Sequence, residues 1–236
     1  MIDTTFVPGL IKCKAPHSTT KLSLSSTEST VIKGPPTTAI ESAHTTLSTL
    51  ARQLNDSAAR TEFRDTSHTF KSLGDLAKNI IDKIAGQSYY ANRKLHDSEI
   101  PDTDDAALLA RAGQATQFAN GTGKNPFAGL SQDHLRLIMY DESGCYTINE
   151  RSAAFSENYA KEEAWNRAIA KRYVDEYNET GKSTETLVMI LAHYNELPPI
   201  EKAQYPANYA ANLTADDSSA MAIFSRLETR VSGSRT

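Results

Sequence analysis

Few side chains in this sequence could carry out covalent chemistry, and the candidate nucleophile is Cys145. A catalytic thiol needs a base beside it, and His134 and His193 are the candidate bases. Spacing along the chain does not establish that these groups meet. The nucleophile elbow G-x-S-x-G and the zinc motif H-E-x-x-H are both missing from the sequence. The sequence therefore favours a non-enzymatic protein, with a cysteine-dependent enzyme using Cys145 as an alternative.

Calcium binding is a second chemistry that the sequence raises. Segment 141–152 resembles an EF-hand loop, because oxygen-bearing side chains occupy its first, third, seventh and ninth positions. These candidate metal ligands are Asp141, Ser143, Thr147 and Asn149. The sixth position holds Tyr146, where the turn needs glycine, and the twelfth holds Ser152, where a bidentate glutamate is needed. The loop predicts either a calcium-responsive module or an Asx-type turn that leads into a capped helix.

No other cofactor is expected, and neither is nucleic acid. Segment 122–125, Thr-Gly-Lys-Asn, resembles the end of a phosphate-binding loop, but Phe118 stands where the first glycine belongs and Asn125 replaces the magnesium-binding hydroxyl. The 25 basic residues are outnumbered by 29 acidic ones, so the net charge is -4. Such a chain has no overall field that attracts phosphate backbones.

Tyrosine is concentrated in the second half of the chain. Eight of the ten tyrosines lie from Tyr140 onward. Tyr205 and Tyr209 lie in a stretch flanked by proline, and we interpret them as candidate contacts to a protein partner, because tyrosine is enriched at interfaces. A second set shares one stripe of a long predicted helix, and we expect it in the core. These residues are Tyr159, Trp165, Ile169 and Tyr173.

The elements that must position these residues are predicted to be helices. Apolar residues recur at spacings of three and four, and caps such as Thr147 with Glu150 or Gly181 bound the segments. Segment 87–105 lacks that period, and most of it predicts an exposed acidic connection or, alternatively, a domain boundary. Asp102 or Thr103 could cap the helix that follows. The continuous apolar run 187–192 predicts a helix in the middle of the core. Helices are expected from residue 40 to about 64, at 70–85, 104–119, 148–180 and 185–196. A short helix is expected from Ser131 through Ile138, and a last one, capped by Thr214 and Asp217, through Val231 to its end at Gly233.

The chain as a whole therefore predicts an all-α protein, an irregular bundle of about six to seven helices. Residues 1–39 carry thirteen Ser or Thr and few acids, which predicts a disordered N-terminal tail. Segment 40–86 predicts an amphipathic helix or helical hairpin, and 87–236 a main helical domain with which it could share one core. The longest apolar run is six residues, so no transmembrane segment is expected.

The two cysteines, Cys13 and Cys145, are too few and too distant for a disulfide framework, and we expect both to be reduced thiols. The first residues show neither a basic region nor an apolar region of a signal peptide. We therefore expect a cytoplasmic protein, or one exported by a route without a cleaved signal peptide.

Several short runs resemble an uncharacterised group of all-α bacterial proteins with no assigned activity. They are Asp141–Gly144, Tyr146–Thr147, Asn149–Arg151, His193–Asn195 and Tyr205–Pro206, and the resemblance spans roughly residues 75–210. The resemblance implies a bacterial origin and a helical body, and it implies no site. The leading hypothesis is a non-enzymatic helical protein that binds another protein, a leaderless secreted or effector-like factor, with oligomeric state undetermined.

Overall fold

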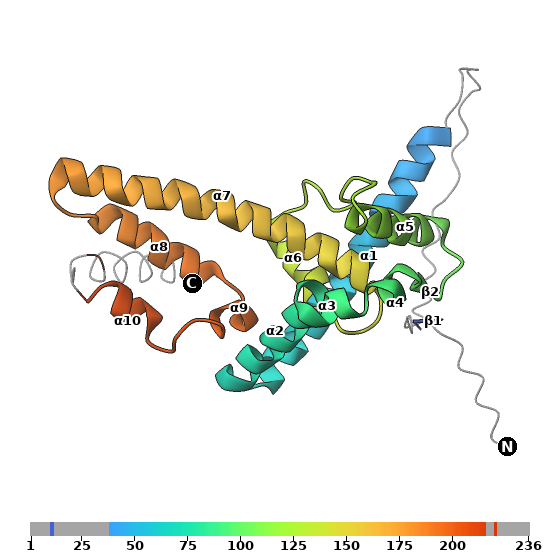
Figure 1. Ribbon diagram of the computed structural model, residues 1–236, viewed down its shortest axis with the longest axis horizontal. Coiled ribbons are helices and arrows are strands. Elements are labelled where there is room, and N and C mark those ends of the chain that lie inside the picture. The colour runs from blue at the N-terminus through green and yellow to red at the C-terminus, as the bar shows by residue number, and fades with distance from the viewer. Residues whose placement is uncertain (1–9, 12–37, 216–219, 221–236) are drawn as a thin grey trace, which may run out of the picture.

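The computed structural model describes residues 10–11, 38–215 and 220, and it confirms the all-α class (Figure 1). The predicted tail 1–39 and the last predicted helix lie outside the described residues, except for 10–11, 38–39 and a helical Ala220. The strands are β1 (Leu10–Ile11) and β2 (Ile100–Pro101), which pair in parallel. The helices are α1 (Thr38–Ser67), α2 (Phe70–Ala85), α3 (Gln87–Ala91), α4 (Arg93–Asp97), α5 (Ala106–Ala119), α6 (Gln132–Met139), α7 (Ile148–Thr180), α8 (Thr184–Glu196), α9 (Pro199–Lys202) and α10 (Tyr209–Leu213).

One hydrophobic core joins α1 and α2 to the later helices, so segment 40–86 and the chain after it share this core. Helix α2 is amphipathic and packs against α3, α7 and α9, and its buried residues belong to the same core as those of α6 and α7. The core is formed by Leu54, Leu73, Ala77, Ile80, Ile84, Ala115, Phe127, Leu135, Ile138, Met139, Tyr140, Tyr146, Ala153, Ala154 and Ile200. We call this part of the molecule, α1 to α6 with α7 up to Tyr159, the body.

Local sequence sets most of the helix boundaries. Thr147 and Glu150 form the predicted capping box, in which each side chain bonds the other's backbone amide. Gly181 ends α7 with φ of 74°, a left-handed conformation that glycine adopts without strain. Ser131 caps α6 as expected. The prediction for α5 was wrong, because Asp105 caps it instead of Asp102 or Thr103.

Segment 87–105 is not the exposed connection that its composition predicted. It contains α3 and α4, and Tyr89 is 3% exposed while His96 is 9% exposed. The two rings stack with their centroids 5.4 Å apart. Burial of one face of such short helices leaves no long apolar period in the sequence, which is why the pattern was missed.

Helix α8 does not lie in the middle of the core. Helix α7 is about 50 Å long, and its second half leaves the body and runs alongside α8 (Figure 1). Leu187 and Leu191 of α8 are buried, but Met189 is 43% exposed. The prediction of a core helix from the apolar run 187–192 was wrong, because the neighbouring helices cover only one side of α8. We call α7 from Ala160 onward together with α8 the arm.

No helix in the described part of the chain is long and apolar enough to cross a membrane.

Candidate functional site

The loop before α7 is tied to α1 through Asp141. Its Oδ2 accepts hydrogen bonds from Ser57 Oγ and from Arg60 Nη2, both at 2.6 Å, and its Oδ1 accepts one from the amide of Ser143 at 2.8 Å. Burial opposes ionisation of this carboxyl, but the hydrogen bonds from Arg60, Ser143 and Ser57 outweigh burial and lower its pKa below the ordinary value. The oxygens of Asp141 are therefore engaged by protein donors.

The other candidate calcium ligands have separate partners. Ser143 Oγ accepts from the amide of Cys145, and Thr147 Oγ1 accepts from the amide of Glu150. Asn149 is fully buried and points toward α3 and α4. In residues 38–215 no group of three or more His, Cys, Asp or Glu side chains could hold a metal ion. This arrangement does not favour the calcium alternative, and it matches the Asx-type turn leading into a capped helix.

The expectation of a reduced thiol at Cys145 was wrong, because this residue is disulfide-bonded. The other cysteine of the sequence, Cys13, lies outside the described residues. Of the candidate bases, His134 is exposed on α6 and His193 on α8 stacks on Trp165, with ring centroids 3.8 Å apart. A disulfide sulfur carries no nucleophilic lone pair comparable to that of a thiolate, so the structure does not support the cysteine-dependent enzyme.

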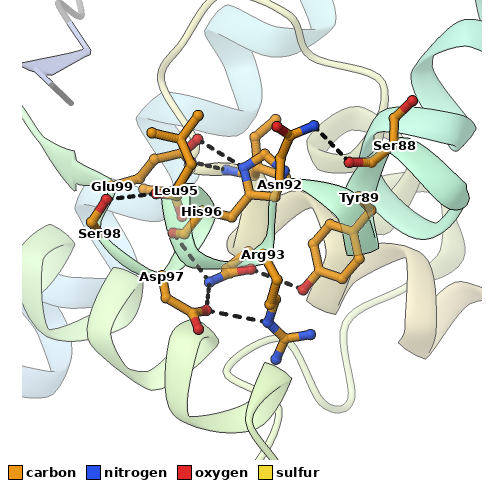
Figure 2. A network of polar contacts seen from close by, with 12 residues as sticks. Ser88, Tyr89, Asn92, Arg93, Leu95, His96, Asp97, Ser98 and Glu99 are labelled. Carbon is orange, nitrogen blue, oxygen red and sulfur yellow. Dashed lines mark hydrogen bonds and ion pairs between the residues drawn. The ribbon is translucent and has the colours of Figure 1, made fainter.

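A buried polar network at the N-terminus of α7 was missed by the sequence reasoning. Figure 2 shows Tyr89, His96, Asp97 and Glu99 of this network. Tyr89 Oη donates to Asn149 Oδ1 at 2.9 Å, and Asn149 Nδ2 donates to Asp97 Oδ1 at 3.0 Å. Glu99 Oε2 accepts from the backbone amide that begins α7, that of Ile148, at 2.7 Å.

Beside this network lies a buried ion pair. Arg111 Nε donates to Glu150 Oε1 at 2.6 Å, and the Glu150 side chain is 0% exposed. The other oxygen of Glu150 accepts from the amide of Thr147 in the capping box. Glu150 is thus both a cap and a buried counter-ion. Each of these polar side chains has a hydrogen-bond or ion-pair partner within the protein. We therefore interpret the network as structural, because it connects α4, α5 and α7.

Tyr205 and Tyr209 form a cluster with Tyr194 of α8. The ring centroids are 4.7 Å apart between Tyr205 and Tyr209, and 5.3 and 4.9 Å from Tyr194 to these two rings. Both candidate partner residues are half-buried, and burial raises the pKa of each. The cluster holds α10 against the end of α8, and no described contact assigns it to a partner.

The tyrosines of α7 that we expected in the core are exposed. Tyr159 is 59% exposed and Tyr173 is 41% exposed, and only Ile169 of the predicted stripe is fully buried. The prediction was wrong because α8 covers the face at Trp165 and Ile169, which is rotated from the face of the tyrosines. Val174, 55% exposed, and Tyr177, 58% exposed, extend the exposed apolar surface. We call Tyr173, Val174 and Tyr177 the distal stripe.

The distal stripe is compact, since residues three and four apart on a helix are neighbours. Charged side chains beside it are paired with each other: Lys171 Nζ lies 2.6 Å from Asp175 Oδ2, and Arg172 Nη2 lies 3.0 Å from Glu185 Oε2. The arm therefore exposes two aromatic side chains and one aliphatic side chain near these two ion pairs. Contiguous exposed apolar side chains of this kind mark interaction surfaces more often than chance.

Comparison with known proteins adds no site: no family model matches the chain, and no curated protein or solved structure is significantly similar to it.

Proposed function

We propose that this chain is a non-enzymatic helical protein that binds another protein, and that the distal stripe on α7 is the binding surface. The observation that supports the proposal is the exposure of Tyr173, Val174 and Tyr177 on a helix whose neighbouring face is already covered by α8. Tyrosine at such a position contributes a large contact area with little conformational entropy to lose.

The occupant that fits this surface is an amphipathic helix of the partner. The stripe has the three- and four-residue spacing with which helices pack against each other. Lys171 is paired with Asp175 and Arg172 with Glu185, so both of these cations already have a carboxylate partner and do not select a strongly acidic segment. An apolar helix face without clustered acidic residues is therefore the complementary partner.

Site-specific photo-cross-linking tests this proposal. A photoreactive phenylalanine at Val174, which is 55% exposed, is expected to capture one defined protein, while the same group at Tyr90, which is 67% exposed on the body, is not. Tyr173→Ser with Tyr177→Ser is expected to abolish capture, and Tyr90→Ser to leave it intact. Equal capture from both positions, or capture of a second copy of this chain alone, would contradict the proposal.

The same proposal includes delivery outside the producing cell, supported by the Ser/Thr-rich, acid-poor composition of residues 1–39. A fusion of residues 1–39 to a reporter enzyme is expected to carry the reporter into the medium or a host cell. A scrambled segment of the same composition is the control. Equal delivery of the reporter with and without the segment contradicts the export part and leaves the binding part standing.

A further inference from the structure

A cavity of about 280 Å³ lies where the arm meets the body, separate from the distal stripe. Four aromatic rings from three regions line it: Tyr140 after α6, Phe155 and Tyr159 on α7, and Tyr205 after α9. Phe155 and Tyr159 stack with their centroids 6.1 Å apart. Tyr159 is more than half exposed, so the cavity opens to solvent on its side. Aromatic faces carry negative partial charge, and a ring cluster of this kind attracts cations.

Three of the polar side chains in the same wall, those of Asn158, Glu162 and Glu201, bring hydrogen-bond acceptors. Asn158 is 8% exposed, lines the cavity, and its Oδ1 accepts no hydrogen bond from any described residue. A buried acceptor without a donor is costly, so a ligand that brings an N–H group would satisfy it. The carboxylates of Glu162 and Glu201 line the cavity beside Asn158.

These carboxylates are only partly neutralised. Arg136 Nε lies 2.8 Å from Glu201 Oε2, and its Nη atoms also lie 3.9 Å from Glu162 Oε2 and 3.4 Å from Asp133 Oδ1. One guanidinium therefore faces three carboxylates. Glu162 Oε1 additionally lies 2.7 Å from His193 Nε2. Burial, followed by the nearby charge of Glu162, raises the pKa of Glu201, so a further positive charge would stabilise its ionised form.

We propose that this cavity binds an organic ammonium group, held by the rings of Tyr159 and Tyr205, the carboxylate of Glu162 and the unsatisfied Oδ1 of Asn158. The cavity is at the small end of ligand sites, which fits an alkylammonium group and excludes a nucleotide. The group comes either from a small amine or from a lysine side chain of a partner protein. The inference does not depend on the proposed function, because none of its residues belongs to the distal stripe.

Calorimetry on the full chain tests the proposal with four probes. Two primary alkylammonium ions, n-butylammonium and n-propylammonium, represent small amines, and Nα-acetyl-lysine N-methylamide represents a protein lysine. The neutral isostere of n-butylammonium, 1-butanol, is the control. The three cations are expected to bind saturably and the neutral isostere at least about tenfold more weakly. Tighter binding of the lysine compound than of n-butylammonium identifies a partner's lysine as the source, and the reverse order identifies a small amine.

Two pairs of variants connect binding to the cavity. Glu162→Gln is expected to weaken binding about tenfold, while Glu163→Gln, the same change at the adjacent position where the carboxylate pairs with Arg167, leaves it unchanged. Tyr159→Leu is expected to weaken binding about 3- to 30-fold, while Tyr177→Leu on the same face outside the cavity does not. Circular dichroism checks that each variant is folded.

The side-chain amide signal of Asn158 in a nitrogen-15 NMR spectrum provides a second readout. It is expected to shift on addition of n-butylammonium and not on addition of the neutral isostere. Three results would each overturn the proposal: no saturable binding of any cation at about 10 mM, equal binding of the isostere, or equal losses in Glu162→Gln and Glu163→Gln.

Discussion

The two halves of α7 belong to one helix but are stabilised in different ways. The first half is held by the buried pair of Arg111 and Glu150, whose side chains are 10% and 0% exposed. The second half has exposed pairs such as Lys171 and Asp175, with side chains 78% and 59% exposed. Exposed pairs contribute little, whereas breaking a buried pair is strongly destabilising. The body half therefore depends on tertiary contacts, and the arm half depends mainly on α8 and on helix propensity.

This difference separates folding from binding along a single helix. Side chains of the body half are engaged by other elements, so few of them can change without loss of stability. The distal stripe contributes little to the core, so its tyrosines can be replaced while the fold persists. Substitutions in the body half should therefore lower the free energy of unfolding strongly. Substitutions in the distal stripe should change it little and should weaken partner binding instead.

The largest effect is expected at Glu150. Glu150→Ala leaves Arg111 buried without its counter-ion and removes half of the capping box, so the free energy of unfolding should fall by about 3–5 kcal/mol. Glu150→Gln can still accept from the amide of Thr147 and should cost less. Urea denaturation followed by circular dichroism measures both variants. A loss for Glu150→Ala no larger than that for Asp175→Ala would remove the distinction between the two halves.

The next effect is expected at Asp141 and depends on pH. Because its pKa is lowered in the folded state, its ionised form contributes stability above its ordinary pKa of 3.8, and this contribution is lost as the pH falls through the lower folded-state value. Asp141→Asn should lower the free energy of unfolding at pH 7 by about 1–3 kcal/mol and flatten the acid limb of the stability curve. Denaturation midpoints between pH 7 and pH 3 check this. An acid limb as steep as that of the wild-type chain contradicts it.

In the arm, the largest effect is expected at Glu176. Its Oε1 accepts from the amide of Glu185 at 2.9 Å and its Oε2 from the amide of Thr186 at 2.9 Å, so a side chain of α7 caps α8. Glu176→Ala should cost about 0.5–2 kcal/mol and speed hydrogen exchange in α8 more than in α2. Glu179→Ala, an exposed glutamate one turn away, is the control. Unchanged exchange in α8 would show that the cap contributes nothing.

The smallest effect is expected for the exposed side chains of the arm. Asp175→Ala should change the free energy of unfolding by less than about 0.5 kcal/mol, because its ion pair is exposed. Tyr177→Ser should be equally mild for stability, while partner capture is lost. Thermal melts and capture assays on the same preparations compare the two readouts. A large drop in melting temperature for Tyr177→Ser would mean that this ring has a folding role.

Sequence reasoning predicted the all-α class and the ends of α7 correctly, but it misplaced several faces. Tyr159 and Tyr173 were expected in the core because they share a helical stripe with Ile169, yet only Ile169 is covered. Segment 87–105, which contains Tyr89 and His96, was expected to be mostly an exposed connection, yet both of these side chains are buried. A periodic pattern identifies an apolar face, and it does not identify which part of that face a neighbouring helix will cover.

For the candidate sites too, the sequence identified nearby residues but not their distant partners. The sequence singled out Asp141, Thr147 and Asn149 as candidate metal ligands in segment 141–152, and the structure buries all three. It could not show that their partners come from three different places, Arg60 on α1, Glu150 within α7 and Tyr89 on α3. No sequence pattern predicted the cavity, because residues that line it come from distant parts of the chain. Asn158 and Glu201, for example, are 43 positions apart.

By itself, the sequence determined both ends of α7 and the start of α6, because the caps Thr147, Gly181 and Ser131 act on backbone groups within three or four residues. The tertiary structure alone decided which side chains became buried ion pairs, which lined the cavity and which stayed exposed. Those outcomes depend on contacts between distant segments, such as the 39 residues that separate Arg111 from Glu150. Excluding water strengthens the attraction between the two charges but costs their desolvation, so such a contact is favourable only where the fold already holds both partners in good geometry.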